Sequence, residues 1–167
     1  MDHTRWPAPL LQPDPHDGCV LYSVAYLCRC LGHPDVTPEQ VQQFRQERRL
    51  QEYCYPGEFG DVTIHYWQYR HGELEWQRFW LGPAQRSWVE SYLAAGYLGL
   101  ASVKRTPGYG HALVVLEDKG DDGVLVMDPL YGHRIESWDW LLASGVGHLC
   151  HRINGWYRAA DRAVARQ

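Results

Sequence analysis

The stretch TPGYGHALVVLEDKGDDGVLVMDPLYG, residues 106–132, holds two apolar segments separated by a polar, glycine-rich connection. Each segment has the length and composition of a β-strand, and the DKGDDG between them is typical of a hairpin. His111 opens the first segment and Asp128 closes the second. Because the start of one hairpin strand lies beside the end of the other, the sequence predicts that His111 and Asp128 meet at the same edge of a sheet.

The segments around this hairpin predict an α+β domain. Helical patterns are expected in the first half, and apolar strand patterns dominate the second. A stretch at 52–82 is dense in aromatic residues and glycine but has no single period, so it is interpreted as an irregular or short-stranded insertion. Further helices are expected at 37–50, 86–95 and 137–144, and further strands at 97–103 and 147–158.

Cys19 stands where the polar, proline-broken segment QPDPHDG (12–18) meets an apolar helical pattern. The pattern continues to Gly32, so the sequence predicts a largely buried helix that begins at Cys19. The unpaired N–H groups and the dipole at a helix N-terminus stabilise a thiolate, which is the reactive form of cysteine. Cys19 is therefore a candidate nucleophile, with His111 as its general base and Asp128 as the group that orients the base.

A cysteine at the start of a buried helix, then GH before an apolar strand, then an apolar strand ending in DP, resembles the papain-like cysteine peptidases. The closest resemblance is to their bacteriocin-leader-peptidase branch, whose members cut after double-glycine leaders. The resemblance implies a papain-like fold, with an N-terminal helical part packed on a C-terminal antiparallel sheet. It also implies that Cys19 is the nucleophile, His111 the base and Asp128 the third member of a triad.

The resemblance also implies an oxyanion hole made by Gln12 and the backbone N–H of Cys19. Two features depart from the branch. Six residues separate Gln12 from Cys19, one more than is usual, and Val20 follows the cysteine where glycine is common. No ATP-binding segment follows, so a leader-processing transporter is not expected.

Size and composition limit the other classes of function. At 167 residues the chain predicts one domain, over 1–157, followed by a basic tail at 158–167. A net charge of -4 without a basic block argues against a nucleic-acid partner. No secretory h-region and no long apolar stretch is visible, so we expect no membrane span and a cytoplasmic location, with export by a specialised secretion route left open. Five cysteines, an odd number, argue against a disulfide framework.

A metal site is the first competing interpretation, because His148, Cys150 and His151 lie close together in the sequence. A structural zinc site needs two ligand clusters, and Cys28 and Cys30 do not face one side of a helix. No metal and no cofactor is therefore expected. The aromatic stretch at 65–80, within the aromatic-rich region 52–88, resembles a stacking platform, but without a basic groove it is better interpreted as core and cleft wall. His16 is interpreted as a loop residue bordering the site.

The residues together predict a cysteine peptidase that hydrolyses a peptide or amide bond in a peptide or protein substrate, through a thioester intermediate. Three alternatives stay open at this point. The same triad serves an acyltransferase or transamidase when an amine replaces water. It also serves a toxin or effector that acts on a host or rival protein. The same fold without catalysis is a peptide-binding module, although the presence of Cys19 with both partners favours an enzyme.

Overall fold

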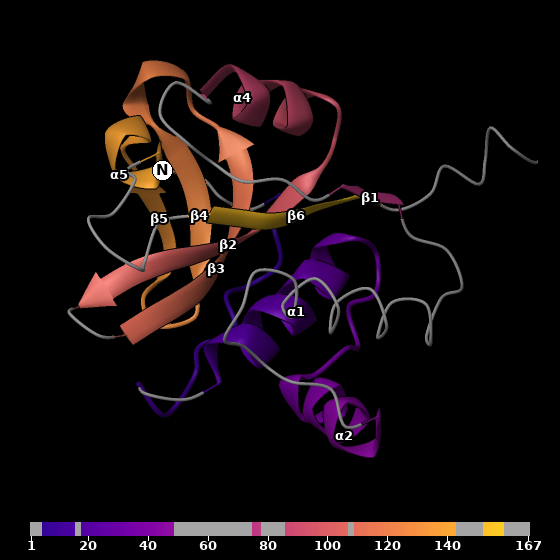
Figure 1. The fold of residues 1–167 in the computed structure, drawn as a ribbon. Coiled ribbons are helices and arrows are strands. Elements are labelled where there is room, and N and C mark those ends of the chain that lie inside the picture. Colours follow the sequence, from indigo (N-terminus) through magenta and orange to yellow (C-terminus); the bar gives the residue numbers. More distant parts are fainter. Residues whose placement is uncertain are drawn as a thin grey trace, which may run out of the picture.

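The computed structural model describes residues 5–15, 18–48, 75–77, 86–106, 109–142 and 152–158. Its centre is a six-stranded antiparallel sheet with the strand order β1-β6-β2-β3-β4-β5 (Figure 1). The strands are β1 (Glu75–Gln77), β2 (Leu98–Thr106), β3 (Tyr109–Asp118), β4 (Val124–Asp128), β5 (Gly132–Glu136) and β6 (Arg152–Arg158). The described helices are α1 (Cys19–Cys30), α2 (Pro38–Arg48), α4 (Arg86–Ala94) and α5 (Trp138–Leu142). The predicted α+β class and antiparallel sheet are confirmed.

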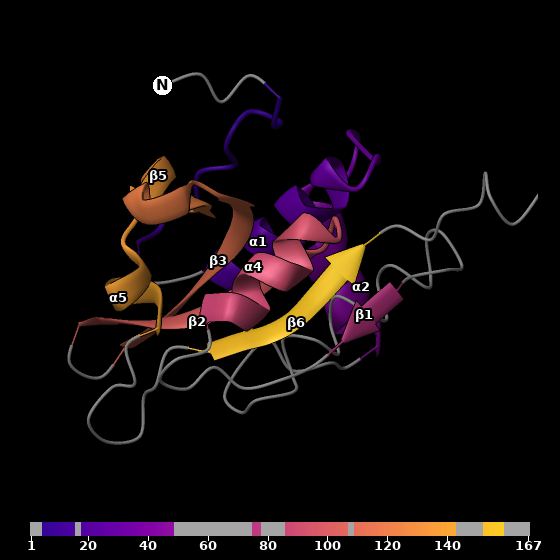
Figure 2. The same cartoon turned by 90° about the horizontal axis from the view of Figure 1, so that it is seen from above.

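Helices cover both faces of the sheet (Figures 1 and 2). On one face α1 and α2 share an apolar core with alternate residues of β3 and β4, among them Ala112, Val114, Leu116, Leu125 and Met127. On the other face α4 and α5 pack against the intervening residues, among them Leu113, Val115, Val124 and Val126. The hairpin strands are therefore buried on both faces, which explains why their sequence is almost continuously apolar.

Helix α1 begins at Cys19, as predicted, and is the most buried helix described. Gly18 precedes it with a φ of 98°, a left-handed conformation that glycine adopts without steric cost. Val20, Val24 and Leu27 are fully buried against the sheet. The first turn of α1 is therefore held firmly, and the Cys19 side chain is placed at the rim of this core.

Helix α2, predicted at 37–50, begins with a capping box. The Thr37 backbone N–H donates to Gln40 Oε1 at 3.0 Å, and the Gln40 N–H donates to Thr37 Oγ1 at 3.2 Å. Only one side of this polar helix is exposed. Val41 and Phe44 are buried in the core that α1 also occupies. Two apolar residues three apart are enough to anchor a helix whose other side is charged.

The predicted hairpin joins β3 to β4 through a 3₁₀ turn, η1 (Gly120–Asp122). Gly123 follows this turn with a φ of 124°, and a Cβ added there would overlap the carbonyl oxygen of Glu136. The close approach of β5 to this turn therefore requires glycine.

Strand β5 is the element that sequence reasoning missed. It follows β4 after a tight turn in which the Tyr131 N–H donates to the Asp128 carbonyl oxygen at 3.1 Å. Its sequence, GHRIE, is short and largely polar, and only Gly132 in it is buried. An edge strand of this kind carries little of the alternating hydrophobic pattern that identifies a strand.

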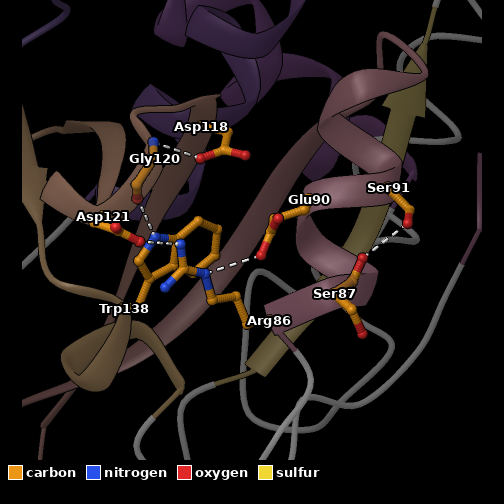
Figure 3. A network of polar contacts seen from close by, with 8 residues as sticks. All are labelled: Arg86, Ser87, Glu90, Ser91, Asp118, Gly120, Asp121 and Trp138. Atoms are coloured by element: carbon orange, nitrogen blue, oxygen red, sulfur yellow. Dashed lines mark hydrogen bonds and ion pairs between the residues drawn. The ribbon is translucent and has the colours of Figure 1, made fainter.

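A second polar network lies at the corner between α4, η1 and α5 (Figure 3). The Arg86 guanidinium pairs with Glu90 at 2.9 Å and with Asp121 at 3.1 Å, and it lies 4.7 Å from the centre of the Trp138 ring. The Trp138 indole N–H donates to the Gly120 carbonyl oxygen at 2.6 Å. These contacts join three elements on the sheet face opposite α1.

Several predictions fall on residues outside the described ranges. These are most of the aromatic-rich region 52–88, the first half of the predicted final strand and the basic tail beyond residue 158. None of the helices in the described part of the chain is long and apolar enough to cross a membrane.

Candidate active site

His111 and Asp128 meet at one end of the sheet, as predicted. His111 Nε2 lies 2.7 Å from Asp128 Oδ1, and the same carboxylate oxygen accepts the Leu130 backbone N–H at 2.8 Å. Both residues are buried, with 4% of His111 and 6% of Asp128 exposed. The carboxylate therefore fixes the ring through Nε2, and Nδ1 is the nitrogen left for another partner.

The register of the hairpin explains this contact. The ladder between β3 and β4 pairs Val114 with Met127, so Asp128 follows opposite Leu113. His111 is two residues from Leu113 and therefore projects from the same face of the sheet. Diagonal neighbours in an antiparallel pair are within reach of long side chains, which is the geometry observed here.

Cys19 reaches this pair from another element. Its side chain is partly exposed and lies close enough to the His111 ring to hydrogen-bond with it. Strand alternation places His111 with the core of α4 and α5, whereas α1 packs on the opposite face. The helix start therefore meets the histidine around the end of the sheet, and all three predicted triad residues come together there.

The ionisation of this cluster follows from burial and from charge. Burial of the ring lowers the pKa of His111, but the hydrogen bonds and charges of Asp128 and Cys19 outweigh burial and raise this pKa to about 9. Burial raises the pKa of Asp128, but His111 and the Leu130 N–H outweigh it and the net direction is downward. At neutral pH the pair is thus an imidazolium beside a carboxylate.

Gln12 is held next to the Asp128 turn. Its backbone N–H donates to the Pro129 carbonyl oxygen at 2.7 Å, and its side-chain Nε2 donates to the Asp14 carbonyl oxygen at 2.7 Å. Gln12 is buried although Leu11 and Pro13 beside it are exposed.

The segment that carries Gln12, residues 5–15, is called the N-terminal strap below. It is attached at its other end by three polar contacts, of which the first is the ion pair between Arg5 Nη1 and Glu117 Oε1 at 3.5 Å. The Trp6 indole N–H donates to Glu117 Oε2 at 3.0 Å, and the Tyr26 hydroxyl donates to the Pro7 carbonyl oxygen at 2.8 Å. Trp6 and Leu10 also pack against the core of α1.

Sequence reasoning missed Tyr26 and His133. The Tyr26 hydroxyl lies 2.7 Å from His133 Nε2, and Tyr26 is fully buried. Cys30 lies against the same hydroxyl, and burial raises the pKa of the Cys30 thiol to about 12. The signal available in the sequence was the spacing of seven residues between Cys19 and Tyr26, which places both on one side of a helix.

The structure does not describe several other histidines and cysteines of the sequence. His16, Cys54, His148, Cys150 and His151 lie outside the described residues. Among the residues that are described, no group of three or more His, Cys, Asp or Glu side chains is placed to hold a metal ion. Cys19, Cys28 and Cys30, the cysteines of the described ranges, form no disulfide.

No family model matches the chain, and none of the curated protein sequences is significantly similar to it. The class of protein is therefore argued from the geometry of the site.

Proposed function

We propose that the chain is a thiol hydrolase of the papain-like type, with Cys19 as nucleophile, His111 as proton carrier and Asp128 as the residue that orients His111. One observation carries the proposal. A buried His–Asp pair, joined at 2.7 Å, presents its ring to a cysteine at the N-terminus of a helix. Perturbed ionisable groups in such an arrangement are typical of nucleophilic catalysis.

The likeness to a papain-like fold supports the same proposal. A buried helix that begins with the cysteine packs on an antiparallel sheet, and adjacent strands of that sheet carry the histidine and the aspartate. The histidine uses one ring nitrogen for the carboxylate and leaves the other for the sulfur. This division of roles is what a cysteine–histidine–carboxylate triad requires.

The proposed reaction proceeds by acyl transfer. The thiolate of Cys19, favoured by the imidazolium beside it, attacks an amide carbonyl, so that a C–S bond forms and the carbonyl oxygen becomes an oxyanion. The intermediate collapses with cleavage of the C–N bond, and the His111 imidazolium gives its proton to the leaving amine. Neutral His111 then takes a proton from water as the water attacks the thioester. Cleavage of the C–S bond releases the acid and restores the starting pair.

The oxyanion needs two donors in this scheme. The Cys19 backbone N–H belongs to the first turn of α1, where it has no intrahelical acceptor. The second is assigned to the Gln12 side-chain amide, by the resemblance to the papain-like peptidases, and the Gln12 backbone is held at the Asp128 turn by its bond to Pro129. Removal of one such donor typically reduces the rate by about 10²–10³-fold.

Alkylation with iodoacetamide tests the nucleophile without knowledge of the substrate. We expect Cys19 to react fastest near neutral pH, and Cys30 to react slowly because its raised pKa, about 12, keeps its thiol protonated. Peptide mass mapping of the modified residue at short reaction times measures both rates in one sample. The variant His111→Ala should slow labelling of Cys19 by about tenfold or more, since the neighbouring imidazolium is lost.

The control for this experiment is Cys30→Ala, which should leave the labelling of Cys19 unchanged. Equal labelling of Cys19 and Cys30, or a Cys19 rate that ignores the loss of His111, would contradict the proposal. A proteome digest by the wild type, compared with Cys19→Ala, would then identify the substrate. Adding a small amine separates the two fates of the acyl-enzyme, because hydrolysis yields a free acid and transamidation yields a new amide of different mass.

A further inference from the structure

Two large apolar side chains are exposed beside the turn that carries Asp128. Tyr131 is 59% exposed and Leu11 is 55% exposed. Both lie at Gly132, since Tyr131 precedes it and Leu11 Cδ2 is 4.0 Å from where a Cβ of Gly132 would be. In the described part of the chain Trp88, on α4, is the only other large apolar residue so exposed. Large apolar side chains that are exposed together mark binding surfaces, whereas single ones need no explanation.

Arg134, on β5, adds a positive charge to this surface. Its guanidinium carbon lies 5.0 Å from the centre of the Tyr131 ring, and its side chain is half exposed. Its ion pair in the described part of the chain joins Nε to Glu136 Oε1 at 3.4 Å. Because this pair is made through Nε, the terminal nitrogens of the planar fork remain available to a ligand. Their spacing matches the oxygens of a carboxylate.

The register of β4 and β5 places Arg134 on the same face of the sheet as Asp128. Asp128 pairs with Gly132, and Arg134 is two residues further along β5. Because side chains alternate along a strand, positions 132 and 134 share the face of Asp128. Arg134 is therefore a diagonal neighbour of Asp128, at a spacing of about 7–8 Å. The exposed surface is thus continuous with the proposed active site.

Arg134 lies within reach of a substrate held at Cys19. Its closeness to the triad has an electrostatic effect: burial raises the pKa of Asp128, the contacts described above lower it, and the charge of Arg134 adds a smaller effect in the same downward direction. An extended peptide advances about 3.3 Å per residue. A peptide cleaved at Cys19 therefore reaches Arg134 within about five residues of the bond that is cut.

We propose that Leu11, Tyr131 and Arg134 form a substrate-binding surface that selects peptides with a carboxylate beside a large apolar side chain. The fork of Arg134 binds the carboxylate, and Tyr131 and Leu11 cover the apolar side chain. This inference rests on the proposed function and deepens it, since it names the substrate class. The occupant follows from the positive charge of the donors that remain and from the continuity of the surface with the proposed active site.

Digestion of a proteome-derived peptide library measures this preference without a known substrate. Among the cuts made by the wild type and not by Cys19→Ala, a carboxylate should be enriched at one position within about five residues of the bond that is cut. A large apolar residue should be enriched next to it. Arg134→Gln should abolish the enrichment of the carboxylate, because the fork and its charge are lost. Tyr131→Ala should instead reduce the enrichment of the apolar residue.

A synthetic peptide of one such cleavage site gives the size of the effect. Replacing the preferred carboxylate with a neutral amide should lower kcat/KM of the wild type by about tenfold, the order expected for a hydrogen bond to a charged group. The replacement is made separately at the acidic side chain and at the C-terminus of the peptide, and the one that has this effect identifies the source of the carboxylate. With Arg134→Gln the acidic and the neutral peptide should be cleaved equally fast, as a double-mutant cycle requires for a direct contact.

The matched control is Arg86→Gln. Arg86 is also partly exposed, lies over an aromatic ring and pairs with carboxylates, but it is placed at the corner of α4, η1 and α5 (Figure 3). This variant should leave the carboxylate preference unchanged. Arg134→Lys keeps the charge without the fork, so it should retain only part of the preference. Circular dichroism at the assay temperature establishes the folded fraction of each variant.

Failure of this inference and failure of the proposed function are distinguishable. The absence of any Cys19-dependent cleavage would overturn the proposed function, and the inference with it. Cys19-dependent cleavage without a carboxylate preference would overturn the substrate-binding surface alone. A preference that Arg134→Gln retains, or that Arg86→Gln also loses, would do the same.

Discussion

Two of the charged networks in the described part of the chain differ in almost every physical respect. His111 and Asp128 are buried at the end of the sheet and are joined at 2.7 Å. Arg86 pairs with Glu90 and Asp121 on the surface, where 38% of the Arg86 side chain is exposed and Asp121 is fully exposed. Both networks join separate elements, yet only the buried one shifts the pKa of a residue far enough to change its charge at neutral pH.

The difference shows why burial makes a charged pair informative. In water the energy of an ion pair is small, so a surface network forms wherever complementary side chains meet. In the protein interior an isolated charge is costly, and a buried pair persists only when its geometry is good. The Arg86 network is explained by its role at the corner of α4, η1 and α5. The His111–Asp128 pair interrupts two otherwise apolar strands, and packing alone does not explain it.

The largest expected effect comes from removal of the nucleophile. Cys19→Ala should reduce the burst of p-nitrophenol released from p-nitrophenyl acetate by about 10³-fold or more, since the covalent route is lost. Cys30→Ala, in the same helix, should leave the burst within about twofold of wild type, because Cys30 contacts Tyr26 only at its sulfur and is not part of the triad. A burst retained in Cys19→Ala would contradict a catalytic role for the buried pair, His111 and Asp128, and its cysteine.

The next largest effect is expected for Asp128→Asn, on the pKa of His111, because this variant removes the charge that raises that pKa. In the wild type that ring should titrate near pH 9, and in the variant well below, since burial remains while the carboxylate is lost. Imidazole NMR, assigned with His111→Asn, measures both values. An unchanged His111 titration in Asp128→Asn would show that the pair is not the cause of the shift.

The same variant makes a signed prediction for stability. The raised pKa of His111 stabilises the fold fully below pH 6.5, the ordinary pKa of histidine, and this contribution is lost as pH rises through about 9. The lowered pKa of Asp128 adds stability above 3.8 that is lost at lower pH. The free energy of unfolding, measured with urea, should therefore be higher for the wild type than for Asp128→Asn. The difference should be about 3 kcal/mol at most near pH 5–6 and should shrink toward pH 10.

The smallest effect is expected at the surface network. Arg86→Gln removes the pairs with Glu90 and Asp121 and the contact over Trp138, all in a position open to solvent. Its Tm should fall only slightly, and less at high salt, because exposed ion pairs are screened. The labelling rate of Cys19 should be unchanged. A loss of stability as large as that of Asp128→Asn would overturn the contrast between the two networks.

The parts of the fold with a clear hydrophobic periodicity or a local turn or cap signal could be predicted from the sequence. The burial of α1, the capping box of α2 and the β3–β4 hairpin all have local signals, and so does the meeting of His111 with Asp128, since one turn separates their strands. Strand β5, which begins at Gly132, has no such signal. A short polar edge strand forms because it pairs with its neighbour, here β4, and not because of its own sequence pattern.

The same limit applies within the candidate site. Tyr26 reads as one more apolar residue of a buried helix, and only the path of the strap gives its hydroxyl a partner in Pro7. His133 falls in the missed strand, so no pattern pointed to it. Contacts between residues far apart in the chain depend on tertiary packing, which hydrophobic periodicity does not encode.

The order of the site residues along the chain has a consequence during synthesis. The cysteine emerges from the ribosome early, whereas His111 and Asp128 are only 17 residues apart and appear together much later. Until that hairpin has formed and the helix has docked on it, the thiol has no imidazolium beside it. In the proposed mechanism the nascent chain therefore carries an ordinary cysteine, and its reactivity begins only when the last of the three residues has been translated and folded.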